Sequence, residues 1–357
     1  MRRDLSPYTV LLSFVMYILL ASYSIHGFIL QNGYTYSVNG AYVPVKNIAN
    51  ESNAHIPLYD HRVINNEIIA SPSVPIASLS LSGGGAYGAF QVGCLKALLE
   101  ANIVKFDTID TISVGGLIGS FLAQYNMEDQ YEGIMELERV WHTIVSNKNI
   151  YKHWRLSFIE GIFYRNGLYN PIPLTKMIKI NLDVSKLVNS NVDFHAATTN
   201  IQSGDMVVFD KNDKNIADAV LAGCSIPVMF PPVKIDDKLY VDAGIKRYFW
   251  GTHLSDTDKP TVVITTSHYD SENTKLPPKN MLGYGASVIR VFMDSLYVED
   301  MSRMINRDNV YVIQPRKKLQ GGGMTFKKQD ILENIDIGYR QVKQMIFENE
   351  LDIITPV

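Results

Sequence analysis

Two strand–turn–helix units follow one another early in the chain, and they constrain its fold more than any other feature. In the first unit, IASLSLS alternates apolar and hydroxyl residues as a strand does, three glycines follow, and AFQVGCLKALLEAN has helical spacing. In the second unit, FDTIDTI leads through a turn of small residues into GGLIGSFLAQY. Strands that alternate with helices are typical of parallel sheets with crossover helices, so we predict an α/β fold.

The rest of the chain supplies further elements for such a sheet. Residues 128–190 have a helical pattern with many aromatic side chains and are expected to cap the sheet. Further strands are expected in VDFHAATTN, DMVVFD, TVVITTS and VYVIQP. A closing helix is expected over ILENIDIGYRQVKQMIFENE, and no internal repeat is visible. We therefore predict one domain over residues 74–357.

One buried face is predicted for the first helix. The side chains that share this face at helical spacing are Phe90, Cys94, Leu95, Leu98 and Leu99.

The N-terminal part of the chain differs in composition from this domain. Residues 8–30 contain no Asp, Glu, Lys or Arg, and two arginines precede them. A run of this length suits a membrane span, and the small serines after its apolar centre also suit signal-peptide cleavage. We expect residues 1–30 to be a signal peptide or an N-terminal membrane anchor, and residues 31–73 to be a linker or arm. The protein is then expected to be membrane-anchored through its N-terminal helix, or secreted.

Composition excludes several classes of function. The formal net charge is −3, whereas nucleic-acid-binding proteins usually present a clustered basic face, so no nucleic-acid partner is expected. The two cysteines, Cys94 and Cys224, cannot form a disulfide framework or a zinc site by themselves, and both are expected to be buried. No calcium loop or other metal motif is visible, so we expect no cofactor and no metal.

The glycine run at residues 83–85 has two alternative interpretations. Backbone amides beside the start of a helix bind anions, including the oxyanion of an ester hydrolysis. The first and third glycines, together with Gly88, also match the dinucleotide fingerprint G-x-G-x-x-G. Asp107 and Asp110 lie near the position of the acidic residue that binds the ribose in such proteins. The glycine loop alone therefore leaves a nucleotide-binding enzyme as an alternative.

Ser113 stands in the second turn, in the string TISVG. This string approximates the nucleophile elbow G-x-S-x-G, in which a sharp strand-to-helix turn exposes the serine hydroxyl. Gly115 fits this pattern, whereas Thr111 replaces its first glycine. The alternative is an ordinary serine that caps a helix.

A catalytic serine needs a base, and the histidines offer no distinctive candidate. His142, His153 and His195 lie in helix-like or strand-like runs and are interpreted as structural or surface residues. Asp242 ends the strand-like run KLYV and precedes Ala243 in a turn that would expose its carboxylate. The alternative for Asp242 is an Asx-turn residue.

Four motifs in this order, SGGGAYGAF, TISVGG, LAGCSIPVMFPPV and YVDAG, resemble those of the patatin-like phospholipases. The resemblance implies a three-layer α/β/α fold with a central, mainly parallel sheet. It also implies hydrolysis of phospholipid or other acyl-lipid esters at a membrane surface by a Ser-Asp dyad. Matched by motif, Ser113 is the nucleophile and Asp242 its base. The glycines that match the loop supplying oxyanion-hole amides are Gly83, Gly84 and Gly85.

The chain departs from the family pattern beside these residues. Thr111 and Ala243 stand where the family usually has glycine, and Tyr87 stands where it often has a basic residue. A second hypothesis is therefore a catalytically degenerate patatin-like protein that binds lipid or a partner. The aromatic segment from Trp141 to Tyr164 is interpreted either as helical core or as a lid that faces lipid.

Overall fold

The computed structural model describes residues 74–251, 259–267, 281–303 and 307–351. Both N-terminal predictions, a signal or anchor at residues 1–30 and a linker at residues 31–73, fall outside this part of the chain. Within it, no helix combines the length and the apolar character needed to cross a bilayer. The chain divides into two compact units, and apart from residues 281–285 every described residue belongs to the larger one.

One mixed sheet of eight strands runs through this unit, in the order β5-β6-β3-β2-β1-β7-β8, with β4 paired to β3. Strands β1, β2, β3, β7 and β8 are parallel, whereas β4 and β6 run antiparallel to β3, and β5 antiparallel to β6. The strands are β1 (Ile76–Leu81), β2 (Lys105–Thr111), β3 (Asp193–Asn200), β4 (Met206–Asp210), β5 (Val233–Ile235), β6 (Lys238–Asp242), β7 (Thr261–Ile264) and β8 (Val310–Ile313). The predicted α/β fold with a mainly parallel sheet is confirmed.

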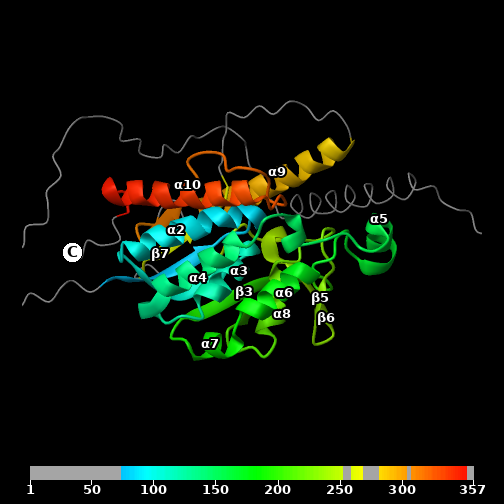
Figure 1. The fold of residues 1–357 in the computed structure, drawn as a ribbon, viewed down its shortest axis with the longest axis horizontal. Coiled ribbons are helices and arrows are strands. Elements are labelled where there is room, and N and C mark those ends of the chain that lie inside the picture. Colours follow the sequence, from blue (N-terminus) through cyan, green and yellow to red (C-terminus); the bar gives the residue numbers. More distant parts are fainter. Residues whose placement is uncertain (1–73, 252–258, 268–280, 304–306, 352–357) are drawn as a thin grey trace, which may run out of the picture. The chain divides into compact units, whose positions relative to one another are not determined.

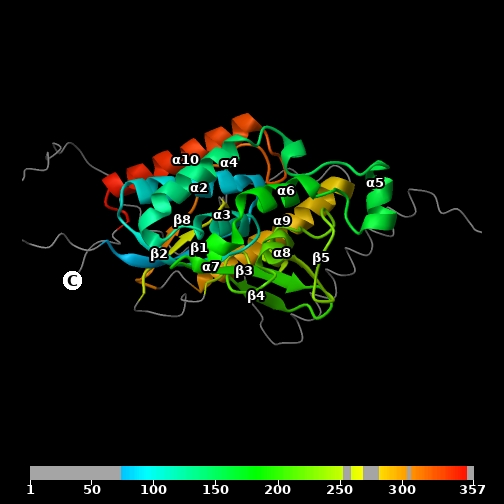
Figure 2. The same cartoon turned by 60° about the horizontal axis from the view of Figure 1, so that its bottom comes forward.

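Helices connect the strands, as Figures 1 and 2 show. The α-helices are α2 (Gly88–Glu100), α3 (Val114–Leu122), α4 (Gln130–His142), α5 (Ser157–Glu160), α6 (Ile172–Asn181), α7 (Val184–Asn189), α8 (Ile216–Gly223), α9 (Met281–Ser302) and α10 (Lys328–Phe347). Short 3₁₀ turns are η1 (Gly85–Tyr87), η2 (Met127–Asp129), η3 (Asn147–Asn149) and η5 (Ala243–Ile245), and α5 continues into one π-helical turn, η4 (Gly161–Arg165).

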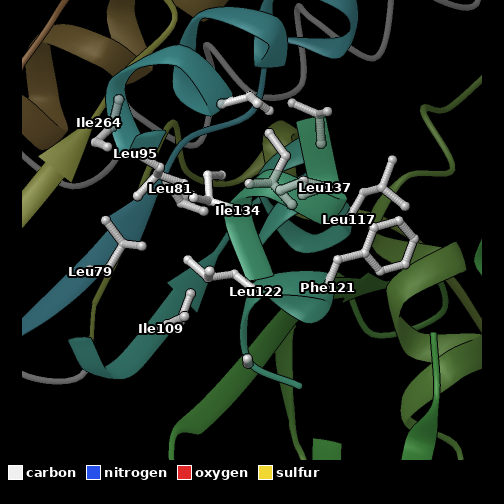
Figure 3. Close-up of a cluster of buried hydrophobic side chains, with 14 of the residues drawn as sticks. Leu79, Leu81, Leu95, Ile109, Leu117, Phe121, Leu122, Ile134, Leu137 and Ile264 are labelled. Carbon is white, nitrogen blue, oxygen red and sulfur yellow. The ribbon is translucent and has the colours of Figure 1, made fainter. Parts of the chain in front are cut away.

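Apolar side chains cover both faces of the sheet. On one face, strand residues such as Leu79 and Ile109 pack against α2, α3 and α4, as Figure 3 shows. On the other face, Val263 of β7 packs with Phe249 and with Tyr297 of α9. Because successive strand residues point to opposite faces, β7 contributes Val262 and Ile264 to the first core and Val263 to the second. The result is the predicted order of helix, sheet and helix layers.

Helix α2 is buried on nearly every side. The predicted apolar face is buried, but most of the other side chains of α2 are buried too, and only Lys96 and Glu100 reach solvent. The reason is that α10 covers its outer side, as Figures 1 and 2 show. A Cβ atom on Gly93 would lie 2.0 Å from the carbonyl oxygen of Ile335, so the two helices cross at backbone contact.

Candidate active site

The predicted site residues follow neighbouring strands of the sheet. The glycine loop comes after β1 and Ser113 comes after β2, and these two strands are parallel neighbours. The carboxyl ends of parallel strands meet at one edge, and the amide of Ile112 donates a hydrogen bond to the carbonyl of Leu81 there, at 3.0 Å. A Cβ atom on Gly83 would lie 3.7 Å from Oγ of Ser113. The fold therefore brings the glycine loop and Ser113 together.

Ser113 occupies a sharp, strained turn. Its backbone has φ 54° and ψ −126°, a conformation that residues with a side chain rarely adopt, and α3 begins at the next residue. A Cβ atom on Gly115 would lie 2.5 Å from the carbonyl oxygen of Leu81, which explains why this turn needs a small residue two positions after the serine. The geometry is that of a nucleophile elbow rather than of a helix cap, because the Ser113 side chain caps no α3 amide.

Thr111, the main departure from the elbow pattern, points away from this turn. Its hydroxyl donates to the carbonyl of His195 in β3 at 2.7 Å. Its methyl group lies beside α3, where a Cβ atom on Gly119 would lie 2.6 Å from it. The bulk of Thr111 is thus accommodated between β3 and α3, and a glycine in α3 supplies the space.

Asp242 lies at the end of β6, and its side chain is almost completely buried, at 3% exposure. The amide of Gly244 donates to its Oδ1 at 2.7 Å, and the Ser113 hydroxyl is a second hydrogen-bond partner. Burial raises the pKa of Asp242 to about 6, although these two hydrogen bonds act in the opposite direction. Asp242 is therefore both the predicted Asx-turn residue and a neighbour of Ser113, with a pKa suited to accepting a proton near neutrality.

The glycine loop presents unpaired amides. Within the described ranges, the backbone N–H groups of residues 83, 84 and 85 donate no hydrogen bond to another protein group. The hydroxyl of Thr266, just after β7, donates to the carbonyl of Gly83 at 2.6 Å and fixes that peptide plane. Since the N–H and C=O of a trans peptide point in opposite directions, the N–H of Gly84 then points away from Thr266. Val114, the first residue of α3, offers a further amide without a helical partner.

Sequence reasoning missed a second glycine-containing loop that lies against the first. We call residues 320–326, between β8 and α10, the strap. The carbonyl of Gly323 accepts a hydrogen bond from the amide of Ala86 at 2.7 Å, and a Cβ atom on Gly85 would lie only 2.1 Å from that carbonyl oxygen. The hydroxyl of Tyr87 donates to the carbonyl of Gly321 at 3.1 Å. Tyr87 stands where the family pattern often has a basic residue. In this chain its hydroxyl tethers the glycine loop to the strap.

Side chains from two other parts of the chain hold the strap in place. The Asn334 side chain of α10 bonds both backbone groups of Gln320, at 2.8 and 3.1 Å. The Tyr151 hydroxyl donates to the carbonyl of Met324 at 2.7 Å. The strap is therefore anchored along its length, and no sequence motif marks it because its partners lie far away in the chain.

An apolar cavity adjoins Ser113. Its walls include Leu117 of α3, Trp141 of α4 and Phe230, while the strap contributes Met324 and Phe326. The volume of the cavity is about 40 Å³, close to the space of one water molecule, so side chains must move before a long chain enters. The aromatic segment is divided here, because Trp141 and Tyr151 are buried whereas Phe163 and Tyr164 are exposed.

A larger surface cavity, of about 520 Å³, lies between α2, α4 and α10. It contains none of the predicted site residues, and its charges are paired, as Lys96 with Glu138 at 2.8 Å. Its size alone does not make it the active site, because a reactive centre also needs a nucleophile or base whose environment is unusual.

The two aspartates that a nucleotide-binding site would use for the ribose interact with other protein side chains. Asp110 is buried and lies 2.7 Å from Nδ1 of His195, and Asp107 is paired with Lys259 at 2.5 Å. Burial is the largest single influence and lowers the pKa of His195. The hydrogen bond to Asp110 and the negative charges of nearby aspartates together outweigh burial, and the pKa is raised overall. His195 is thus a structural histidine, as predicted, and neither carboxylate is presented to a ribose at the end of a strand.

The structure also places the other histidines and the two cysteines. His142 lies on the exposed side of α4, 3.9 Å from Glu138, and the ring of His153 packs on Tyr169 with 5.3 Å between centroids. Both cysteines are buried, as predicted, and Sγ of Cys224 contacts the carbonyl of Ser113 at 3.4 Å.

Comparison with known proteins gives matches in sequence and in structure. Residues 79–249 match the family model described as patatin-like phospholipase. An uncharacterized protein, R571, of Acanthamoeba polyphaga mimivirus is 26% identical over 289 residues, which are 76% of this chain and 94% of that protein. The matching part of this chain ends before β7, so the strap lies outside the family match.

Two solved structures are similar at low identity. The crystal structure of VipD from Legionella pneumophila is 14% identical with a TM-score of 0.42, covering 78% of this chain and 67% of that one. The crystal structure of the type III effector protein ExoU is 14% identical with a TM-score of 0.33, covering 79% of this chain and 54% of that one. The present chain therefore spans about half the length of the ExoU chain.

Proposed function

We propose, from the match of residues 79–249 to the family model of patatin-like phospholipases, that this protein is a serine hydrolase that cleaves carboxylic ester bonds of phospholipids. Members of this family are generally lipid hydrolases. The observation that carries the proposal is the Ser113 hydroxyl in a strained turn, beside a buried Asp242 whose pKa is raised to about 6. The unpaired amides of the glycine loop support the same reaction.

The proposed reaction has two halves. In the first, Asp242 accepts the proton of the Ser113 hydroxyl while Oγ attacks the ester carbonyl carbon. The amides of Gly83, Gly84 and Gly85 donate to the resulting oxyanion, and each well-placed donor contributes about 3 kcal/mol to the barrier reduction. As the tetrahedral intermediate collapses, the carbon–oxygen bond breaks and the leaving alcohol takes the proton from Asp242.

The second half releases the acyl group. Asp242, ionised again, accepts a proton from a water molecule that attacks the acyl-enzyme. The new tetrahedral intermediate uses the same amides, and its collapse returns the proton to Oγ of Ser113 and frees the fatty acid. The apolar walls that adjoin Ser113 support an acyl chain as the group that is transferred.

The test is hydrolysis of phosphatidylcholine vesicles by the full chain, followed by mass spectrometry of released fatty acid. We expect Ser113→Ala and Asp242→Asn each to lower the rate by about four orders of magnitude. The matched control is Ser120→Ala, because Ser120 is a buried serine on α3, the helix that follows Ser113, and its hydroxyl donates to the carbonyl of Leu117 at 3.0 Å. Full activity in Ser113→Ala would contradict the proposal.

A fluorophosphonate probe separates this function from the second hypothesis. Labelling of the wild type and not of Ser113→Ala is the expected result, since the probe reacts with activated serines. A wild type that binds phospholipid but is neither labelled nor active would instead support a catalytically degenerate lipid- or partner-binding protein.

The site of action stays a prediction. We propose that the protein is exported or anchored at a membrane by residues 1–30, which would bring the site to its lipid substrate. Sequencing of the N-terminus of the mature protein distinguishes a cleaved signal from a retained anchor.

A further inference from the structure

A helical hairpin exposes an unusual amount of apolar surface. We call residues 155–167, which contain α5 and η4, the α5 hairpin. Figures 1 and 2 show α5 standing apart from the sheet and from the other labelled helices. Its exposed apolar side chains are Leu156 (59%), Ile159 (63%), Ile162 (42%), Phe163 (56%) and Tyr164 (75%). Scattered exposed apolar residues need no explanation, but a contiguous group marks an interaction site.

The base of the α5 hairpin is fixed next to the apolar cavity at Ser113. Nε1 of Trp154 donates to the carbonyl of Gly167 at 2.9 Å and closes the base. Gly167 lies against the backbone of Pro231, where a Cβ atom would approach the nitrogen to 2.4 Å. The amide of Leu168 donates to the carbonyl of Val228 at 2.9 Å. Because Phe230 lines the cavity, whatever binds the α5 hairpin is held beside the active site.

The charges around the α5 hairpin are basic, although the chain as a whole carries a net charge of −3. Between residues 143 and 171 the only acidic residue is Glu160, and Arg165 pairs with it at 2.8 Å. The other cations of this stretch are exposed, namely Lys148, Lys152 and Arg155. Exposed apolar and aromatic side chains next to lysines and arginines are typical of segments that lie in a membrane interface.

We propose that the α5 hairpin docks the protein on an anionic phospholipid surface. Phe163 and Tyr164 enter the boundary between head groups and acyl chains, and Lys152 and Arg155 lie against lipid phosphates. The cavity at Ser113 is then held near the bilayer that supplies its substrate, a consequence that rests on the proposed function. Docking itself requires no catalysis, so the two proposals fail separately.

A fluorescent label on the α5 hairpin tests the proposal. In the full chain, Tyr164→Cys supplies an exposed thiol to which an environment-sensitive fluorophore is attached. The two native cysteines are buried, so the label reacts at position 164. The matched control is Phe347→Cys at the end of α10, since Phe347 is 78% exposed and Tyr164 is 75% exposed. We expect a blue shift at position 164, and none at 347, when vesicles of phosphatidylcholine mixed with phosphatidylserine are added.

The remaining outcomes are also decisive. No shift at 164, or equal shifts at both positions, overturns docking through the α5 hairpin, even where an N-terminal anchor binds the vesicle. A shift that grows with protein concentration in the absence of vesicles shows a second copy of the chain as the partner instead. An equal shift with phosphatidylcholine alone, or no loss of shift after Lys152→Glu with Arg155→Glu, overturns the anionic surface.

An activity ratio supplies an independent measurement. The rate on mixed vesicles is divided by the rate on a soluble short-chain ester for the variant Phe163→Ser with Tyr164→Ser. We expect this ratio to fall several-fold relative to wild type, and to stay unchanged in Phe347→Ser. An unchanged ratio in the double variant overturns docking through these side chains. A wild type that hydrolyses neither substrate contradicts the proposed function, and the fluorescence result then decides docking alone.

Discussion

Two runs of three glycines lie against one another at the candidate active site, and their backbone groups are held in opposite ways. In residues 83–85, two of the glycines have positive φ, 149° and 58°, and no described protein group accepts a hydrogen bond from their amides. In the strap, by contrast, the backbone carbonyls of Gly321, Gly323 and Met324 all accept hydrogen bonds. The first loop keeps its donors available, and the second uses its acceptors to hold the first.

The difference teaches how a loop with unpaired amides keeps its conformation. A buried amide with no partner costs about 1–3 kcal/mol, so unpaired amides need a surrounding structure that prevents the loop from turning inward. Ala86 and Tyr87 provide that support, because both donate to the strap from positions just after the glycines. Variants of the two loops test this division of roles.

Gly85→Ala is expected to have the largest effect. The added Cβ would lie 2.1 Å from the carbonyl oxygen of Gly323 at a φ of +58°, so the loop must move away from the strap. We expect ester hydrolysis to fall by about 10²–10³-fold, the effect of losing one oxyanion donor. Steady-state kinetics on a soluble ester measures this change, and activity within a factor of about two of wild type would show that the contact is dispensable.

The pH dependence of hydrolysis tests the proposed role of Asp242 as the base. Because the pKa of Asp242 is raised to about 6, activity is expected to fall about tenfold per pH unit below that value as the carboxylate is protonated. The raised pKa has a consequence for folding as well: the stability that the proton confers is complete below pH 3.8 and is lost as pH rises through about 6. The full shift corresponds to about 3 kcal/mol.

Asp242→Asn removes this titration and is the control. Chemical denaturation on both sides of the window should show wild type losing stability relative to Asp242→Asn as pH rises. A constant difference across the window would contradict the raised pKa.

Tyr87→Phe is expected to have a smaller effect. It removes the hydroxyl that donates to Gly321 and keeps the ring beside Gly323. We expect a loss of about 1 kcal/mol in the free energy of unfolding, the ordinary value for one hydrogen bond. Faster hydrogen exchange of the strap amides, together with a several-fold lower kcat, would show that the Tyr87 hydroxyl positions the strap for catalysis. An unchanged kcat would show that Tyr87 has only a structural role.

Gly322→Ala should have the smallest effect, although it changes the middle glycine of the strap. Its Cβ would meet only the side chain of Thr325, at 3.3 Å, and its φ is not in the left-handed region. We expect the free energy of unfolding and the activation free energy of hydrolysis each to change by less than about 0.5 kcal/mol. A loss comparable to that of Gly85→Ala would remove the distinction between the two loops.

The sequence predicts the sheet well because strand patterns are local. The alternation in IASLSLS gives β1, the apolar run TVVI gives β7, and Ser113 and Asp242 fall at the predicted strand ends. The parallel order of β1 and β2 follows from the helix between them. Their proximity at one edge could therefore be predicted before the structure.

The strap and the fate of Thr111 could not be predicted in this way. The run GGGMT looks like an ordinary turn, and the bonds that give it a role join residues more than 200 positions apart. Likewise, Thr111 is harmless only because Gly119 lies one helical turn into α3 beside its methyl group. Helix α9 was also missed. Long-range partners of this kind leave no periodic trace in a sequence.

The bond between Tyr87 and Gly321 spans 234 positions of the chain, which has a consequence for biosynthesis. A ribosome completes Ser113 and Asp242 well before it reaches the strap, so a nascent chain can pair its strands while its glycine loop is still unsupported. The proposed nucleophile and base are then made before the residues that hold the proposed oxyanion loop in place. If the proposed function is correct, a nascent chain that ends before the strap carries both proposed catalytic side chains but lacks the support of that loop.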